Sequence, residues 1–97
     1  LKTIPYDIAN YLSSEALIQE YFSQVIEDGD SEEIIDALGH IARARGMADL
    51  AAKTGLGRES LYKTFAAGSK PRFDTILKVM RALDLRITTQ HAVADRN

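Results

Sequence analysis

The segment Met47-Ala-Asp-Leu-Ala-Ala-Lys-Thr-Gly-Leu-Gly-Arg-Glu-Ser-Leu-Tyr-Lys-Thr-Phe65 decides the fold of this 97-residue chain. It predicts two short helices, at 47–54 and 58–66, joined by Gly55-Leu56-Gly57. Gly55 suits the positive φ that a sharp turn demands, and Ala51 is small enough for the second helix to approach the first. We therefore expect two helices that meet near a right angle.

The leucines of this segment set the orientation of the second helix. Leu50, Leu56 and Leu61 are expected to point inward, with Phe65 closing the far end. Helical geometry then places the other side of the helix in solvent. A small residue, a glycine four positions later and leucines at these positions are together typical of a helix-turn-helix that reads duplex DNA. The alternative is a helix-loop-helix that has this pattern by chance.

Four side chains on that outer face are the predicted base readers: Arg58, Glu59, Tyr62 and Lys63. The second helix of such a motif enters the major groove, with its N-terminal residues nearest the base edges. Arg58 suits a bidentate pair with guanine, and Glu59 can accept from a cytosine amino group. An i,i+4 pair of Glu59 with Lys63 in the free protein is the competing interpretation.

Four further residues are predicted to contact DNA phosphates, which position a protein without reading sequence. They are Lys53, Ser60, Lys70 and Arg72. Each of them can equally be an ordinary solvated surface residue.

Charge is divided unevenly along the chain, although the net value is only -2. Residues 1–42 hold one basic residue against nine acidic ones, a balance of -8, whereas residues 43–81 hold nine basic against three acidic, a balance of +6. Such asymmetry indicates a half that binds polyanions and a separate acidic surface. Two solvated charged faces would explain the same numbers.

Composition indicates one soluble globular domain, with 45% hydrophobic and 27% charged residues. The absence of cysteine excludes disulfides and thiolate metal sites. No signal sequence or membrane span is apparent, so we expect a cytoplasmic protein without contact to a membrane.

The predicted fold class is all-α, a compact bundle of five to six helices plus a short C-terminal β-strand. A short helix is expected at 7–12, longer ones at 14–27, capped by Ser14, and at 31–45, capped by Ser31 and ended by Gly46 in the left-handed conformation. Gly39 inside the latter predicts a close helix–helix approach. A helix at 72–83 and a strand at 85–90 complete the fold. The acidic residues 1–30 are expected as a helical extension packed on a core domain at 31–90, followed by a tail at 91–97.

Nothing in the sequence indicates catalysis, a cofactor or a metal site. His40 and His91 lack the spacing of paired ligands. The acidic run Asp28, Asp30 and Glu32 does not match a calcium loop, because the glycine and distal glutamate are misplaced, and it is better explained as a turn and a helix start.

The 47–65 segment resembles the phage-repressor-like (XRE, Cro/C1-type) helix-turn-helix family, also called lambda-repressor-like. The resemblance extends further, through Glu27-Asp-Gly-Asp-Ser, Ala37-Leu-Gly-His-Ile-Ala-Arg-Ala-Arg-Gly-Met47, Glu59-Ser-Leu-Tyr-Lys and Pro71-Arg-Phe-Asp-Thr-Ile-Leu-Lys-Val-Met-Arg-Ala-Leu-Asp-Leu-Arg86. Over about residues 5–88 the chain looks like the bacterial addiction module antidote proteins, antitoxins of a HigA-like kind. Arg72-Phe73 and Asp84 depart from the family's usual residues and leave phosphate contact by Arg72 open.

This resemblance implies an antitoxin of a type II toxin–antitoxin module. Such a protein binds and neutralises a small toxin of the RelE/ParE superfamily and represses the promoter that both genes share. The implied partners are double-stranded operator DNA, the toxin and a second copy of the chain, because palindromic operators call for a two-fold dimer. The strand at 85–90 is the expected pairing element of that dimer. The alternatives are a stand-alone transcriptional regulator and a protein-binding module that no longer binds DNA.

We also expect the acidic N-terminal helices to contact the toxin, since toxins that act on nucleic acid tend to be basic. The competing interpretation is that these helices only complete a small core.

Overall fold

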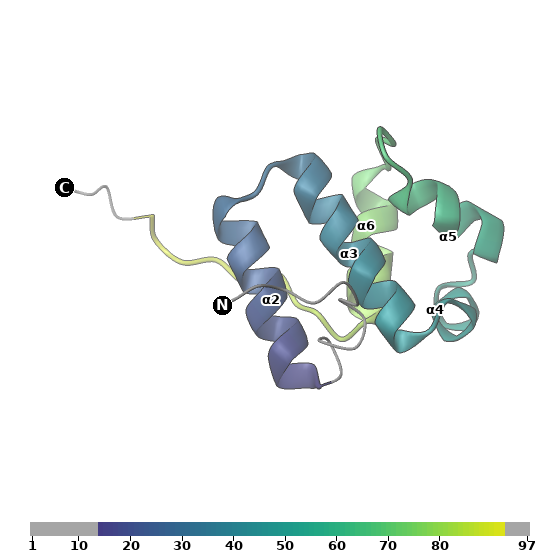
Figure 1. Cartoon of the computed structure of the whole chain (residues 1–97), viewed down its shortest axis with the longest axis horizontal. Helices are drawn as coiled ribbons and strands as arrows, with labels where there is room; N and C mark the ends of the chain where they lie inside the picture. The colour runs from purple at the N-terminus through teal and green to yellow at the C-terminus, as the bar shows by residue number, and fades with distance from the viewer. Residues whose placement is uncertain (1–13, 93–97) are drawn as a thin grey trace, which may run out of the picture.

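The computed structural model describes residues 14–92, and within them it contains five α-helices and no β-strand (Figure 1). The helices are α2 (Glu15–Asp28), α3 (Ser31–Arg45), α4 (Met47–Thr54), α5 (Arg58–Phe65) and α6 (Phe73–Ala82). The predicted all-α class is therefore confirmed for this part of the chain. The helix expected at 7–12 and the tail beyond residue 92 lie outside the described residues.

Side-chain caps fix the starts of the first two helices. The Ser14 hydroxyl accepts from the Leu17 amide at 3.1 Å, as predicted. For α3 the predicted cap was wrong by one residue, because Asp30 and not Ser31 takes this position. The Asp30 carboxylate accepts from the Glu33 amide at 2.9 Å, while Glu33 Oε1 accepts from the Asp30 amide at 2.8 Å. This reciprocal capping box satisfies two amides at once, and it assigns Asp30 and Glu33 structural roles.

Gly46 is shared by two helices, ending α3 and preceding α4. Its amide donates to the Ala42 carbonyl at 2.8 Å, and its carbonyl accepts from the Leu50 amide at 3.1 Å. Its φ of 110° is positive as expected, but its ψ of 117° lies outside the left-handed helical region that the sequence predicted. The difference arises because the chain turns directly into a new helix, so the residue serves the start of α4 as well as the end of α3.

One core joins all five helices. α3 contacts α2, α4 and α5, and α4 contacts α5 and α6; in Figure 1, α2 lies on one side of α3 while α4 and α5 lie on the other. The largest fully buried side chains are Leu38, Ile41, Leu50, Leu61 and Val79. Ile18 and Phe22 of α2 are buried in the same cluster, so α2 is an integral part of the core.

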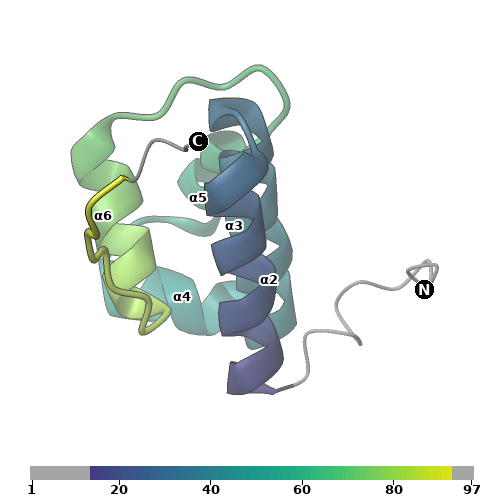
Figure 2. The same ribbon diagram turned by 90° about the vertical axis from the view of Figure 1, so that its left-hand side faces the viewer.

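The predicted strand at 85–90 was wrong. The Leu85 amide donates to the Met80 carbonyl at 2.8 Å, which turns the chain. The following residues form an irregular segment that runs past α2 (Figure 1) and lies in front of α6 in the view of Figure 2. Alternating residues favour an extended backbone, but a strand also needs a neighbouring strand with which to exchange hydrogen bonds. Within residues 14–92 this segment has no such neighbour. In the same part of the chain, no helix is long and apolar enough to cross a membrane.

Candidate nucleic-acid interface

A three-residue connection links α4 to α5 and determines how α5 is presented. Gly55 ends α4 in the left-handed conformation, with φ 76° and ψ 4°, and its amide donates to the Ala51 carbonyl at 2.9 Å. A residue with a β-carbon would be strained there. The positive φ that the sequence predicted for Gly55 is thus confirmed, and it lets the chain leave α4 in a new direction.

Thr54 reinforces this turn, a role that sequence reasoning missed. Its buried hydroxyl donates to the Leu50 carbonyl at 2.8 Å and accepts from the Leu56 amide at 3.2 Å. It therefore forms one hydrogen bond with a carbonyl in the last turn of α4 and another with an amide of the 55–57 connection. A threonine directly before the turn glycine was the available signal, since such hydroxyls often bond to nearby backbone groups.

The inner face of α5 is fixed by two buried residues. Leu61 is fully buried and Phe65 nearly so, and Phe65 lies against Gly39 of α3. The close approach predicted for Gly39 is thereby confirmed. Because residues 61 and 65 are one turn apart, they lock both the rotation and the position of the helix.

The four predicted base readers, Arg58, Glu59, Tyr62 and Lys63, are all exposed on α5. Arg58 and Tyr62 are spaced as neighbours on the helix surface, and so are Glu59 and Lys63. Tyr62 keeps 45% of its surface accessible, so its ring and hydroxyl are open to solvent. The structure thus brings this set together on one short surface helix.

Ion pairs are absent from that face in the described part of the chain. The competing expectation of a Glu59–Lys63 pair is not met there, and Arg58 forms no salt bridge within residues 14–92 either. These charged ends are consequently available to an external partner.

The flanking residues are also exposed, but two of them are paired with nearby acids. Lys53 Nζ lies 3.2 Å from Asp49 Oδ2, and Arg72 Nε lies 3.3 Å from Asp74 Oδ1. Lys53 precedes the N-terminal end of α5, whereas Lys70 and Arg72 follow its C-terminal end in the loop that leads to α6. Ser60 stands on α5 itself, where its carbonyl accepts from the Thr64 hydroxyl at 2.9 Å.

Helix starts differ between the acidic and basic parts of the chain. α2 and α3 have side-chain caps, whereas α4, α5 and α6 have none. Gly57 precedes α5, so the first amides of this helix receive no hydrogen bond from the capping side chain. Amides of this kind, at the positive end of a helix dipole, favour anions.

A second polar cluster, between α2 and α3, was not predicted. Tyr21 Oη lies 2.8 Å from His40 Nδ1, and His40 Nε2 lies 3.8 Å from Asp36 Oδ2. Partial burial, with a smaller contribution from the negative charge of Asp36, raises the pKa of the Tyr21 hydroxyl. His40, which the sequence left without a role, thus bridges two helices. Within residues 14–92, no three histidine or acidic side chains are placed to hold a metal ion.

Two shallow hollows lie on the acidic part of the surface. One, of about 330 Å³, is lined by Tyr21, Gln24, Val25, Asp28, Gly29, Glu33 and Asp36. The other, of about 290 Å³, lies between the start of α3 and the residues after α5, and Glu32, Glu33, Ile35, Asp36 and Phe65 contribute to it. Glu33 and Asp36 belong to both, so the two hollows adjoin. We call them the acidic hollows.

The sequence profile of a protein family described as "Probable addiction module antidote protein" matches residues 2–91. The chain belongs to this antidote family. A protein of Haemophilus influenzae, named "Uncharacterized protein", is similar to it, with 41% identity over 87 residues that cover 90% of each chain. No solved structure matches the antidote chain. The family assignment confirms the antidote part of the resemblance proposed from the sequence.

Proposed function

We propose that α4, the 55–57 connection and α5 form a phage-repressor-like helix-turn-helix, of the XRE, Cro/C1 type, that binds duplex DNA. The observation that carries this proposal is the two-sided character of α5. Leu61 and Phe65 hold one side in the core, and the other side presents exposed polar and charged ends that form no ion pair within residues 14–92. In such motifs the second helix lies in the major groove.

In this proposal the N-terminal half of α5 reads the bases. Arg58, at the first helical position, donates two hydrogen bonds to guanine O6 and N7, and Glu59 accepts from a cytosine amino group. Tyr62 and Lys63, one turn later, contact a base or the adjacent backbone. The amides at the start of α5 donate to a phosphate.

Phosphate contacts come from both ends of the helix. Lys53 serves the N-terminal end, Lys70 and Arg72 the C-terminal end, and Ser60 donates from the helix itself. Because Lys53 and Arg72 are paired with Asp49 and Asp74 in the free protein, binding exchanges those exposed ion pairs for phosphate contacts. Exposed pairs of this kind contribute at most about 1 kcal/mol each, so the exchange is feasible.

The description of the family as an addiction module antidote supports a toxin–antitoxin context for the proposed DNA-binding activity. We propose that the chain is the antitoxin of a type II module, acts in the cytoplasm and represses its own promoter as a homodimer. Its protein partner is a small toxin of the RelE/ParE superfamily, which it neutralises. Support comes from the antidote description of the family together with the separation of charge between the two parts of the chain.

The acidic hollows are the proposed toxin contact. Their carboxylates and apolar floor suit lysine or arginine side chains, which bury an aliphatic stem while their charged end meets an acid. α2 supplies Ile18 and Phe22 to the core. Deleting the N-terminal 30 residues would therefore test folding and not toxin binding. Toxin binding is better tested by substitutions in the acidic hollows.

Two binding measurements test the proposed function. The purified chain is titrated with the DNA upstream of its own gene and with scrambled DNA of the same length, and separately with the product of the adjacent gene. The proposal predicts specific DNA binding and a stable protein complex that restores growth to cells expressing the toxin. DNA binding without such a complex would indicate a stand-alone regulator, and a complex without DNA binding would indicate a module that acts on protein alone.

The toxin surface has its own test. Glu32→Lys together with Asp36→Lys reverses charge in the acidic hollows without altering Glu33, which caps α3. We expect at least about tenfold weaker toxin binding with unchanged circular dichroism. Glu20→Lys, an exposed acid of α2 that does not line the acidic hollows, is the control and should bind normally. Equal loss in both variants would contradict the placement.

A further inference from the structure

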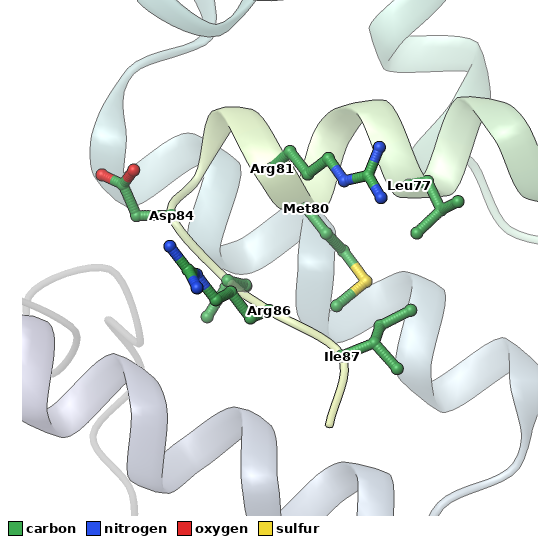
Figure 3. A pocket seen from close by; sticks show the side chains of 7 residues that line it. Leu77, Met80, Arg81, Asp84, Arg86 and Ile87 are labelled. Carbon is green, nitrogen blue, oxygen red and sulfur yellow. The ribbon is translucent and has the colours of Figure 1, made fainter. Parts of the chain in front are cut away.

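An exposed stripe of α6 carries a large aromatic residue at one end and a hollow at the other. Phe73 begins the helix with 66% of its surface accessible. Toward the C-terminal end lies a hollow of about 710 Å³ between α6 and the segment that follows it (Figure 3). Met80 and Ile87 approach it from the two sides, and Leu77 and Arg81 stand along its α6 edge.

Helical spacing places Phe73 and the hollow on the same side of α6. Phe73, Leu77 and Arg81 fall within about a quarter of the helix circumference at 100° per residue, and Met80, which is buried, lies at the edge of this stripe. The core-facing residue Val79 lies on another side and is fully buried. Phe73 and Arg81 are separated by about two turns, or roughly 12 Å.

Opposite charges flank both the projecting Phe73 and the hollow. Arg72 and Asp74 flank Phe73, while Arg81 and Asp84 flank the hollow. A two-fold axis near Leu77, with two copies of α6 antiparallel, brings each Phe73 over the hollow of the other copy. It also brings Asp74 toward the Arg81 of that copy. Self-complementarity of this kind is what a two-fold interface requires.

We propose that this surface, made of Phe73, Leu77, Arg81, Asp84 and Ile87, binds a second copy of the chain by inserting each Phe73 into the opposite hollow. Ile87, which is 54% exposed, is covered in the process. The inference deepens the proposed function by giving its dimer a surface, but it involves neither DNA nor toxin.

Sedimentation velocity of the free protein over a range of concentrations tests this surface. The wild type should be a dimer, and Phe73→Glu should weaken dimerisation at least about tenfold, as expected for a buried aromatic anchor. Because Phe73 is mostly exposed in the single chain, the variant should retain its circular dichroism. Ile26→Glu is the matched control: it changes an apolar residue that is 50% exposed on α2 and should leave the dimer intact.

A charge exchange gives a second readout. Arg81→Glu should weaken the dimer, and adding Asp74→Arg should restore it in part, because these two positions meet across the axis. A monomeric wild type, or a Phe73→Glu variant that still dimerises like Ile26→Glu, would overturn the proposal. A Phe73→Glu variant that dimerises normally but no longer binds the toxin would also overturn the proposal, because this surface would then be a toxin-binding surface. Failure of DNA binding in a protein that dimerises as described would overturn only the proposed function.

Discussion

Gly39 of α3 and Phe65 of α5 lie so close that a β-carbon on Gly39 would stand 3.1 Å from Phe65 Cβ and 3.3 Å from its Cγ. This contact joins the central helix of the core to the helix that presents Arg58, Glu59, Tyr62 and Lys63. Since Phe65 Cβ is attached directly to the α5 backbone, it cannot yield without moving that helix. The distance between α3 and α5 therefore depends on the absence of a side chain at residue 39.

A larger residue at this position should destabilise the protein. Gly39→Val should lower the free energy of unfolding by about 1–3 kcal/mol, the usual cost of forcing extra methyl groups into a packed core. Chemical denaturation measures it. Ala52→Val, at an exposed position of α4, carries only a difference in helix propensity and should cost less than about 0.7 kcal/mol. If both substitutions lowered the free energy of unfolding equally, the close packing at Gly39 would not contribute to stability.

Removing the Thr54 hydroxyl should loosen the connection between α4 and α5. Thr54→Val keeps the shape but loses the bonds to Leu50 and Leu56, which leaves a partly buried amide without its partner. We expect a loss of about 1–2 kcal/mol in unfolding free energy and faster amide hydrogen exchange at Leu56. In Thr64→Val only an exposed bond to the Ser60 carbonyl is lost, so a change above about 0.5 kcal/mol there would argue against a special role of Thr54.

The partly buried hydroxyl of Tyr21, with Asp36 nearby, predicts a stability change at alkaline pH. The raised pKa of Tyr21 means that the folded state favours the neutral phenol. Its contribution is present below the unfolded pKa near 10 and is lost as pH rises through the higher folded pKa. Wild type should therefore lose stability above about pH 10 more steeply than Tyr21→Phe. Denaturation curves at successive pH values compare the two proteins, and parallel pH profiles would contradict the assignment.

Salt should weaken DNA binding in proportion to the phosphate contacts made. The logarithm of the association constant should fall linearly with the logarithm of salt concentration, and each lost phosphate contact should reduce the slope by about 1. Lys70→Ala should show this reduction, whereas Lys78→Ala, an exposed lysine of α6, should not. Identical slopes for the two variants would remove Lys70 from the phosphate contacts.

Features with a local cause were predictable from the sequence. The bounds of α4 and the positive φ of Gly55 follow from neighbouring residues, and the alternation of buried and exposed positions on α5 follows from helical periodicity. The cap of α3 was misplaced because Asp30 and Ser31 are both good capping residues, and only the reach of the Asp30 carboxylate to the Glu33 amide decides between them.

Features that depend on distant residues were not predictable. Tyr21 and His40 are 19 positions apart and meet only because α2 packs on α3. The segment at 85–90 has the alternation of a strand, but a strand also needs a neighbour that periodicity cannot supply. The outer face of α5 was predicted correctly as an exposed set, whereas its reading of bases stays a prediction.

Titration of operator DNA with Arg58 variants, at one fixed salt concentration, tests the central claim most directly. Arg58→Ala should weaken specific binding about 5- to 150-fold, which corresponds to the 1–3 kcal/mol of a bidentate guanine contact. Arg58→Lys should fall in between, because it keeps the charge but not the paired geometry. Both variants should bind the toxin like wild type and scrambled DNA only slightly less well. Equal operator affinity of Arg58→Ala and wild type would contradict the assignment of α5 as the helix that reads DNA.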